Sequence, residues 1–382
     1  MGCEACRQSE PEANFPLINL EVKSNDRQNE TSSEKKHNYD NFTLLFEDKL
    51  QNFGKYFEQE FNTLITPEIL AYMTENPFSL NPEQYEISEV YEMKPIEFNN
   101  GNVYKGGWNE NLKMEGQGKY YLKEDGVLAE GLWKEGNLVY ARVFIGKEDS
   151  FDIYEGEMKN SSFYGKGKLI LSNGVIYEGD FIDGEKTGNG KIIFEDKTVY
   201  EGGVEKGDLS GKGKMIWTNG YEYEGDFGFN KLCGNGILKS PNGEIYEGEF
   251  KNNLFNGYGK YTFKNGNTYE GQFLYGVKKG KGVYKCLNKF EYDGDWDNDL
   301  PCGVGKLSDW NKTGVIKSTW RYGNIMEEPV YEQGTSENFE DIDLNIVPDQ
   351  ITLNIKDLSN LDYTDMQSTQ FKLGTQVSFL DE

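Results

Sequence analysis

The first residues of the chain have the chemistry of a lipid anchor. The sequence begins MGCEACRQS, so Gly2 becomes the acceptor for a myristoyl group once the methionine is removed. Cys3 and Cys6 are close enough to be S-acylated at the same surface, although Cys6 stands where that signal usually has Ser or Thr. One acyl chain binds only marginally and no polybasic patch follows, so we expect the cysteines to supply the second anchor. The alternatives are an unmodified N-terminus and a Cys-x-x-Cys redox or metal pair.

Residue types that commonly perform catalysis are scarce in this sequence. The single histidine, His37, lies in a polar N-terminal stretch, which removes the commonest general base and zinc ligand from the expected folded region. Carboxylate pairs such as Glu178 and Asp180 recur along the chain, so they indicate a solvated stripe and not one acid/base pair. The glycine run Gly207–Gly213 lacks the Ser or Thr that must follow Lys212 in a phosphate loop. We therefore expect no enzyme, no metal site and no cofactor.

The elements that organise the chain are repeats of 23 residues. Each begins with a tyrosine that is followed two places on by glycine and eleven places on by Gly-x-Gly. In the unit Tyr177–Val199 the side chains alternate, with Tyr177 and Phe181 on one face and charged residues on the other. Asn-Gly pairs between units are strong hairpin signals, and we expect positive φ at both residues. The repeat tyrosines are Tyr154, Tyr177, Tyr200, Tyr223, Tyr246, Tyr269 and Tyr292.

The segments YEGEM, YEGDF, YEGEF and YDGDW, with their trailing Gly-x-Gly, resemble MORN repeats. The resemblance covers Tyr104 to about Tyr322. The unit at Tyr104 is one residue longer, and in the next unit Ala129 replaces tyrosine and no Gly-x-Gly follows, which leaves its hairpin in doubt. The resemblance implies an all-β fold, an open antiparallel meander of hairpins, used for binding and scaffolding. The implied partner-binding groove consists of the seven repeat tyrosines with Phe181, Trp217 and Phe263.

Charge is partitioned along the chain. Residues 1–103 hold 8 Lys/Arg against 19 Asp/Glu, residues 104–322 hold 30 against 33, and residues 323–382 hold 2 against 13. The repeats are therefore nearly neutral and the flanks are acidic, which argues against nucleic acid as a partner because phosphate binding needs a basic surface. No apolar run reaches the roughly 20 residues of a spanning helix. Cys233 and Cys302, three units apart, cannot pair, and reduced thiols suit a cytosolic location.

The flanks suggest four segments. Residues 1–37 are an acylated, disordered tether, and 38–100 a helical segment that caps the repeats 101–322. An apolar stripe predicts one helix over Asn41–Ile65, and Thr66 followed by Pro67 predicts a second that ends before Asn76. Residues 323–382 form a mostly disordered acidic tail, in which alternation allows one short strand at Ile351–Ile355.

Two classes of function remain for the repeats. In the first, the chain is a scaffold at the cytosolic face of the plasma or ciliary membrane that binds protein partners or a second copy of itself. In the second, a lysine row binds phosphoinositide or other anionic headgroups, although a glutamate after each tyrosine should neutralise it. A structural subunit of a cilium or cortical cytoskeleton is a further alternative. The row comprises Lys168, Lys191, Lys214, Lys260 and Lys306.

Overall fold

The computed structural model describes residues 32–80, 85–146 and 150–353, in two compact units, Met1–Asp48 and Lys49–Glu382. Gly2, Cys3 and Cys6 lie outside the described residues. The first unit contains most of helix α1 (Ser32–Phe53), in which Phe42 and Phe46 are buried and their ring centroids lie 5.8 Å apart. The helix begins at Ser32, within the segment predicted to be a tether.

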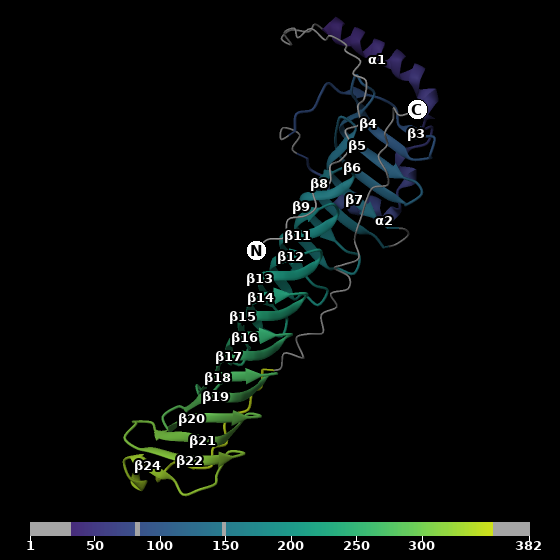
Figure 1. The fold of residues 1–382 in the computed structure, drawn as a ribbon. Helices are drawn as coiled ribbons and strands as arrows, with labels where there is room; N and C mark the ends of the chain where they lie inside the picture. Colours follow the sequence, from purple (N-terminus) through teal and green to yellow (C-terminus); the bar gives the residue numbers. More distant parts are fainter. Residues whose placement is uncertain (1–31, 81–84, 147–149, 354–382) are drawn as a thin grey trace, which may run out of the picture. The chain divides into compact units, whose positions relative to one another are not determined.

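The second unit is built on one antiparallel sheet (Figure 1). From β4 to β22 each strand pairs with the strand before it and the strand after it, which is a meander of hairpins. The predicted fold class is therefore confirmed. The strands of the meander are β4 (Val103–Trp108), β5 (Met114–Leu122), β6 (Val127–Lys134), β7 (Asn137–Ile145), β8 (Asp152–Lys159), β9 (Ser162–Ile170), β10 (Ile176–Ile182), β11 (Glu185–Ile193), β12 (Val199–Glu205), β13 (Asp208–Ile216), β14 (Glu222–Gly228), β15 (Lys231–Lys239), β16 (Ile245–Lys251), β17 (Leu254–Thr262), β18 (Thr268–Leu274), β19 (Val277–Cys286), β20 (Phe290–Asp297), β21 (Leu300–Asp309) and β22 (Val315–Arg321).

Each repeat tyrosine packs flat against two paired glycines. In β14 and β15, Gly225 pairs with Gly236, and a Cβ at Gly236 would lie 2.5 Å from Cε2 of Tyr223. The hydroxyl of Tyr223 donates a hydrogen bond of 2.9 Å to the carbonyl of Asp226. The first glycine of the Gly-x-Gly has a different role, because Gly234 lies in a bulge with φ of 53°. Gly236, and not Gly234, therefore makes room for the ring.

The unit with Ala129 in place of tyrosine forms a regular hairpin from β6 and β7. Gly131 pairs there with Ala141, which occupies the position of the second Gly of Gly-x-Gly. Both alanines are at most 1% exposed. Because no ring lies over the pair, the missing glycine is tolerated, and the doubt about this hairpin is resolved.

Two kinds of turn alternate along the sheet. Between units, the loop after Leu171 has only its glycine at positive φ, 87° at Gly174, while Asn173 accepts a hydrogen bond from the amide of Val175. The prediction of two positive φ values at Asn-Gly is therefore wrong, because these are three-residue loops that end in a left-handed glycine. Within units the turns do place two residues at positive φ, as at Phe229 and Asn230. Sequence reasoning missed these tighter turns because many lack glycine.

Residues 53–98 contain short elements that pack on the first hairpins. α1 ends at Phe53, and the chain continues as β1 (Gly54–Tyr56), the 3-10 helix η1 (Phe61–Leu64) and α2 (Pro67–Glu75). The single helix predicted over Asn41–Ile65 is wrong because the helix breaks at Gly54, whereas the predicted second helix is confirmed, with the hydroxyl of Thr66 capping it. Strands β2 (Tyr91–Glu92) and β3 (Ile96–Phe98) join the sheet beside β4.

The helical residues of this cap pack on an apolar patch of the sheet. Phe61, Ile65 and Ile69 form one buried cluster with side chains from β4, β6, β7 and β8. The members from the sheet occupy the face opposite to the repeat tyrosines, because three of them directly precede the tyrosine position of their strand and the fourth, Phe144, pairs with one of these, Leu128. They are Val103, Leu128, Phe144 and Ile153.

The segment after the repeats turns back along the sheet. It contains β23 (Asn324–Ile325), β24 (Val330–Gln333) and the 3-10 helix η3 (Ser336–Phe339), and β24 pairs with β22. Residues 344–353, which we call the strap, then cross earlier strands: Ile346 bonds to Gly323, and Leu353 reaches Tyr261. The expectation of a mostly disordered tail is corrected for residues 323–353. Ile351–Leu353 is not a strand, and the rest of the strand predicted there lies outside the described residues.

Candidate functional site

The aromatic residues predicted to form the partner-binding groove are core residues. None of the ten exposes more than 7% of its surface. Each tyrosine contacts rings of its own unit, of a neighbouring unit or of both, as Tyr223 does with Phe227 and Phe250, whose ring centroids lie 5.1 Å from its own. Their assignment to partner contact is corrected, because alternation distinguishes two faces but does not show that neighbouring rings close over one of them. The residues are Tyr154, Tyr177, Tyr200, Tyr223, Tyr246, Tyr269, Tyr292, Phe181, Trp217 and Phe263.

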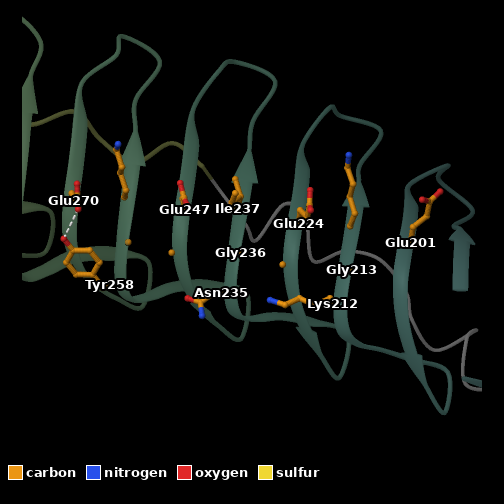
Figure 2. A pocket seen from close by; sticks show the side chains of 15 residues that line it. Glu201, Lys212, Gly213, Glu224, Asn235, Gly236, Ile237, Glu247, Tyr258 and Glu270 are labelled. Carbon is orange, nitrogen blue, oxygen red and sulfur yellow. Dashed lines mark hydrogen bonds between the residues drawn. The ribbon is translucent and has the colours of Figure 1, made fainter. Parts of the chain in front are cut away.

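The charged face carries an open channel with a cavity volume of about 1060 Å³ over β12–β18 (Figure 2). Its floor is a strip of glycine backbone between two rows of side chains. One row is formed by Lys212, Asn235 and Tyr258, the middle residues of three Gly-x-Gly motifs. The other contributes one residue from each strand: Glu201, Lys214, Glu224, Ile237, Glu247, Lys260 and Glu270. We call this surface the glycine channel.

Lysines and carboxylates alternate along the second row because the register places them opposite each other. Lys214 pairs with Glu201 on one side and Glu224 on the other. The pattern changes at β15, where Ile237 stands between Glu224 and Glu247. The register thus places glutamates on both sides of Lys214 and Lys260, while the ion pair of this kind in the predicted row is that of Lys191 with Glu201. The row is acidic within the channel, and its centre is an aliphatic side chain between two carboxylates.

Ion pairs and hydrogen bonds fix the charges at both ends of the channel. Lys191 Nζ lies 2.7 Å from Glu201, and this hydrogen bond raises the pKa of Lys191 and lowers that of Glu201. The hydroxyl of Tyr258 donates to Glu270 at 3.1 Å, a bond that raises the pKa of Tyr258. Outside the channel, Lys306 lies 2.7 Å from Glu332, beyond the repeats. Of the predicted lysine row, Lys214 and Lys260 line the channel, and Lys168, Lys191 and Lys306 do not.

This arrangement is suited to binding an extended surface. The charged groups lie in rows and do not converge on one point. The two groups of a catalytic acid/base pair must both reach the same reacting atoms. Among residues 32–80, 85–146 and 150–353, no group of His, Cys, Asp and Glu is placed to hold a metal ion, and no described helix is both long and apolar enough to cross a membrane. Sequence reasoning missed Ile237 and Tyr258. A signal was present for Ile237, since five of the seven residues at its repeat position are lysine, but none was present for Tyr258, whose position varies between lysine, asparagine and valine.

Comparisons with known proteins identify the repeats. The MORN repeat model matches residues 154–176, 177–199, 200–220, 223–245, 246–268, 269–288 and 292–311. No curated protein matches the chain. Among solved structures, the chain is similar to the TCP domain of SAS-4 (dCPAP) of Drosophila melanogaster in complex with a proline-rich motif of Ana2 (dSTIL), at 14% identity and a TM-score of 0.28, over 41% of this chain and 84% of that one.

A second similar structure is a streptogramin B lyase, at 9% identity and a TM-score of 0.12, over 66% of this chain and 85% of that one. The match to the repeat model, the 23-residue period and the stacking of tyrosine on paired glycines agree with one another. Residues 154–311 of this chain are seven MORN repeats.

Proposed function

We propose that this protein is a non-catalytic scaffold that binds protein partners through the glycine channel. The observation that carries the proposal is the channel itself, an open trough whose floor has no side chains and whose walls present charged, aliphatic and aromatic groups. A floor of glycine lets a partner backbone approach closely. Tyr258 is 57% exposed, and rigid aromatic side chains of this kind are frequent anchors in protein interfaces.

The centre of the channel favours a partner with both basic and apolar side chains. Glu224 and Glu247 are exposed and lie two strands apart, about 9.6 Å at ~4.8 Å per strand, with Ile237 between them. A partner that places an aliphatic group over Ile237 and a Lys or Arg beside each carboxylate would complement this surface.

Binding of anionic headgroups is less well supported by the same geometry. Lys214 and Lys260 each lie between two strands that carry a glutamate in the same row. Lys212 is paired with Asp226, and Lys191 outside the channel is paired with Glu201. Phosphate groups would therefore meet glutamate as often as lysine. Headgroup binding should also fall steeply with ionic strength, whereas contacts with Ile237 and Tyr258 should change little.

Charge reversal in the channel tests the proposal. In the full chain, Glu224→Lys with Glu247→Lys should reduce capture of the protein partner at least about tenfold, because two favourable charge pairs become repulsive. The matched control is Glu178→Lys, an exposed residue at the same repeat position outside the channel. Quantitative affinity capture with identification of bound proteins is the measurement. Equal capture by both variants would show that the partner does not bind in the channel.

We further propose that acyl groups on Gly2, Cys3 and Cys6 hold the scaffold at a membrane facing the cytosol. Burial contributes about 0.8 kcal/mol per methylene, so one chain binds marginally and two bind stably. Gly2→Ala should release the protein into the cytosolic fraction, and Cys3→Ser with Cys6→Ser should leave only transient membrane contact. Cell fractionation measures both.

The control for the anchor replaces the lysines that headgroup binding would need. A variant with Lys168, Lys191 and Lys214 all changed to Ala should remain in the membrane fraction. If the cysteine variant stays bound while the lysine variant is released, headgroup binding is the correct mechanism and the acyl anchor is not.

A further inference from the structure

The strap lies on the tyrosine side of the sheet and is held at one aspartate. Asp349 accepts hydrogen bonds from Asn267 at 2.7 Å, from the hydroxyl of Tyr284 at 2.9 Å and from Asn265 at 3.1 Å. Lys278 donates to the backbone carbonyl of the same residue at 2.9 Å. One residue of the strap thus receives contacts from four side chains of the repeats.

Lys278 is one of two buried lysines at its repeat position among the described residues, the other being Lys186. The side chain of Lys278 is fully buried, and its Nζ lies 5.1 Å from the ring centre of Phe263 and 5.5 Å from that of Trp296. The same repeat position holds the buried residues Leu232 and Phe255 in the two preceding units. Burial lowers the pKa of Lys278 to about 8, against the opposing effect of Asp299 and Asp349. A cation in an apolar row needs an acceptor, and the strap supplies one.

Aliphatic contacts flank the aspartate on both sides. Ile346 is 1% exposed and its amide donates to the carbonyl of Gly323 at 2.8 Å. Leu353 is 5% exposed, and its amide donates to the hydroxyl of Tyr261 at 3.3 Å. Val347 beside them is 87% exposed. The bound strap therefore presents an aspartate three residues after one buried aliphatic and four residues before another.

We propose that the surface beneath the strap is a recognition site for extended peptides of a partner protein that carry this aliphatic–aspartate–aliphatic spacing, and that the strap is its built-in competitor. The repeats form the site with Lys278, Asn267 and Tyr284 as the aspartate pocket. A tethered segment competes at an effective concentration of about 1 mM, so a free peptide with Kd of about 100 μM binds the intact chain roughly tenfold more weakly. The site lies on the face opposite to the glycine channel, so the two proposals can fail independently.

Peptide binding to full-length variants tests the proposal. The strap variant carries Ile346→Ser, Asp349→Ala and Leu353→Ser, and the probe is a fluorescent peptide of the sequence Leu344–Leu353. Fluorescence anisotropy should show the probe binding the strap variant at least about tenfold more tightly than the wild type. A probe with Asp349→Ala should not bind, and a probe with Val347→Ser should bind as well as the original. Adding Lys278→Met to the strap variant should weaken binding.

The single variant Asp349→Ala protects the test against misfolding of the triple variant, and circular dichroism shows whether each sheet is folded. The Asp349→Ala variant should bind the probe with an affinity between those of the wild type and the strap variant. Equal binding to wild type and variants, or no binding to any folded variant, overturns the proposal. Dimers of the wild type that the strap variant does not form would also overturn it, because the strap would then occupy a second copy of the chain.

Discussion

Replacing Tyr223 by alanine should lower the free energy of unfolding by roughly 3 to 5 kcal/mol, the range for large aromatic truncations in cores. The ring is fully buried, it covers Gly225 and Gly236, and Phe227 and Phe250 pack against its edges. Neighbouring units cannot close the cavity, because their own tyrosines stack on their own glycine pairs. Chemical denaturation of the full chain measures the loss.

The control for this prediction is Tyr275→Ala, at a turn residue that is 71% exposed. Its free energy of unfolding should change by less than about 0.5 kcal/mol, as for surface substitutions generally. Equal losses at Tyr223 and Tyr275 would contradict the assignment of the repeat tyrosines to the core.

Replacing Gly236 by alanine should cost about 1 to 3 kcal/mol, as overpacking does, because its Cβ would lie 2.5 Å from Cε2 of Tyr223. In the background of Tyr223→Ala the same change should cost less than about 1 kcal/mol, since no ring remains to collide with. The chain already contains this combination, with Ala129 at the tyrosine position and Ala141 opposite Gly131. A double-mutant cycle by chemical denaturation measures the coupling.

Strict additivity in that cycle would show that the ring is not what excludes a side chain at Gly236. Gly234→Ala serves as the contrasting variant. Its cost arises from φ of 53° and a Cβ that would meet the carboxylate of Asp226. It should therefore be equally destabilising with and without Tyr223.

The repeat region was predictable because one period repeats the same physical constraints. The spacing of Tyr177, Gly179 and Gly190 requires a ring over two glycines, and the sheet has that arrangement. The burial of both sides of the ring was not predictable. It depends on neighbouring units, as when Tyr223 contacts Phe250 of the next unit, and alternation within one strand contains no information about how rings of adjacent units meet.

The channel and the strap show a second limit. Glu224 and Glu247 were recognisable as exposed charges, but the channel also depends on how several strands lie side by side, including register shifts such as that after Gly225, and alternation within one strand does not predict these. The strap has no period, and its contact between Asp349 and Lys278 joins residues 71 positions apart. A partial signal was Lys278 itself, since its repeat position is leucine or phenylalanine in the three preceding units, although Lys186 occupies the same position in the unit before these.

Site-specific photo-crosslinking tests most directly whether the glycine channel is the partner surface. A photoreactive residue replaces Ile237 in the full chain, and a second chain carries it at Ile182, which is 55% exposed but outside the channel. Irradiation in cells should join position 237 to a protein, with an adduct that is lost when Glu224→Lys and Glu247→Lys are also present. Position 182 should give little of that adduct. Adducts to lipid alone from position 237, or the same protein adduct from both positions, would contradict binding of a protein partner in the channel.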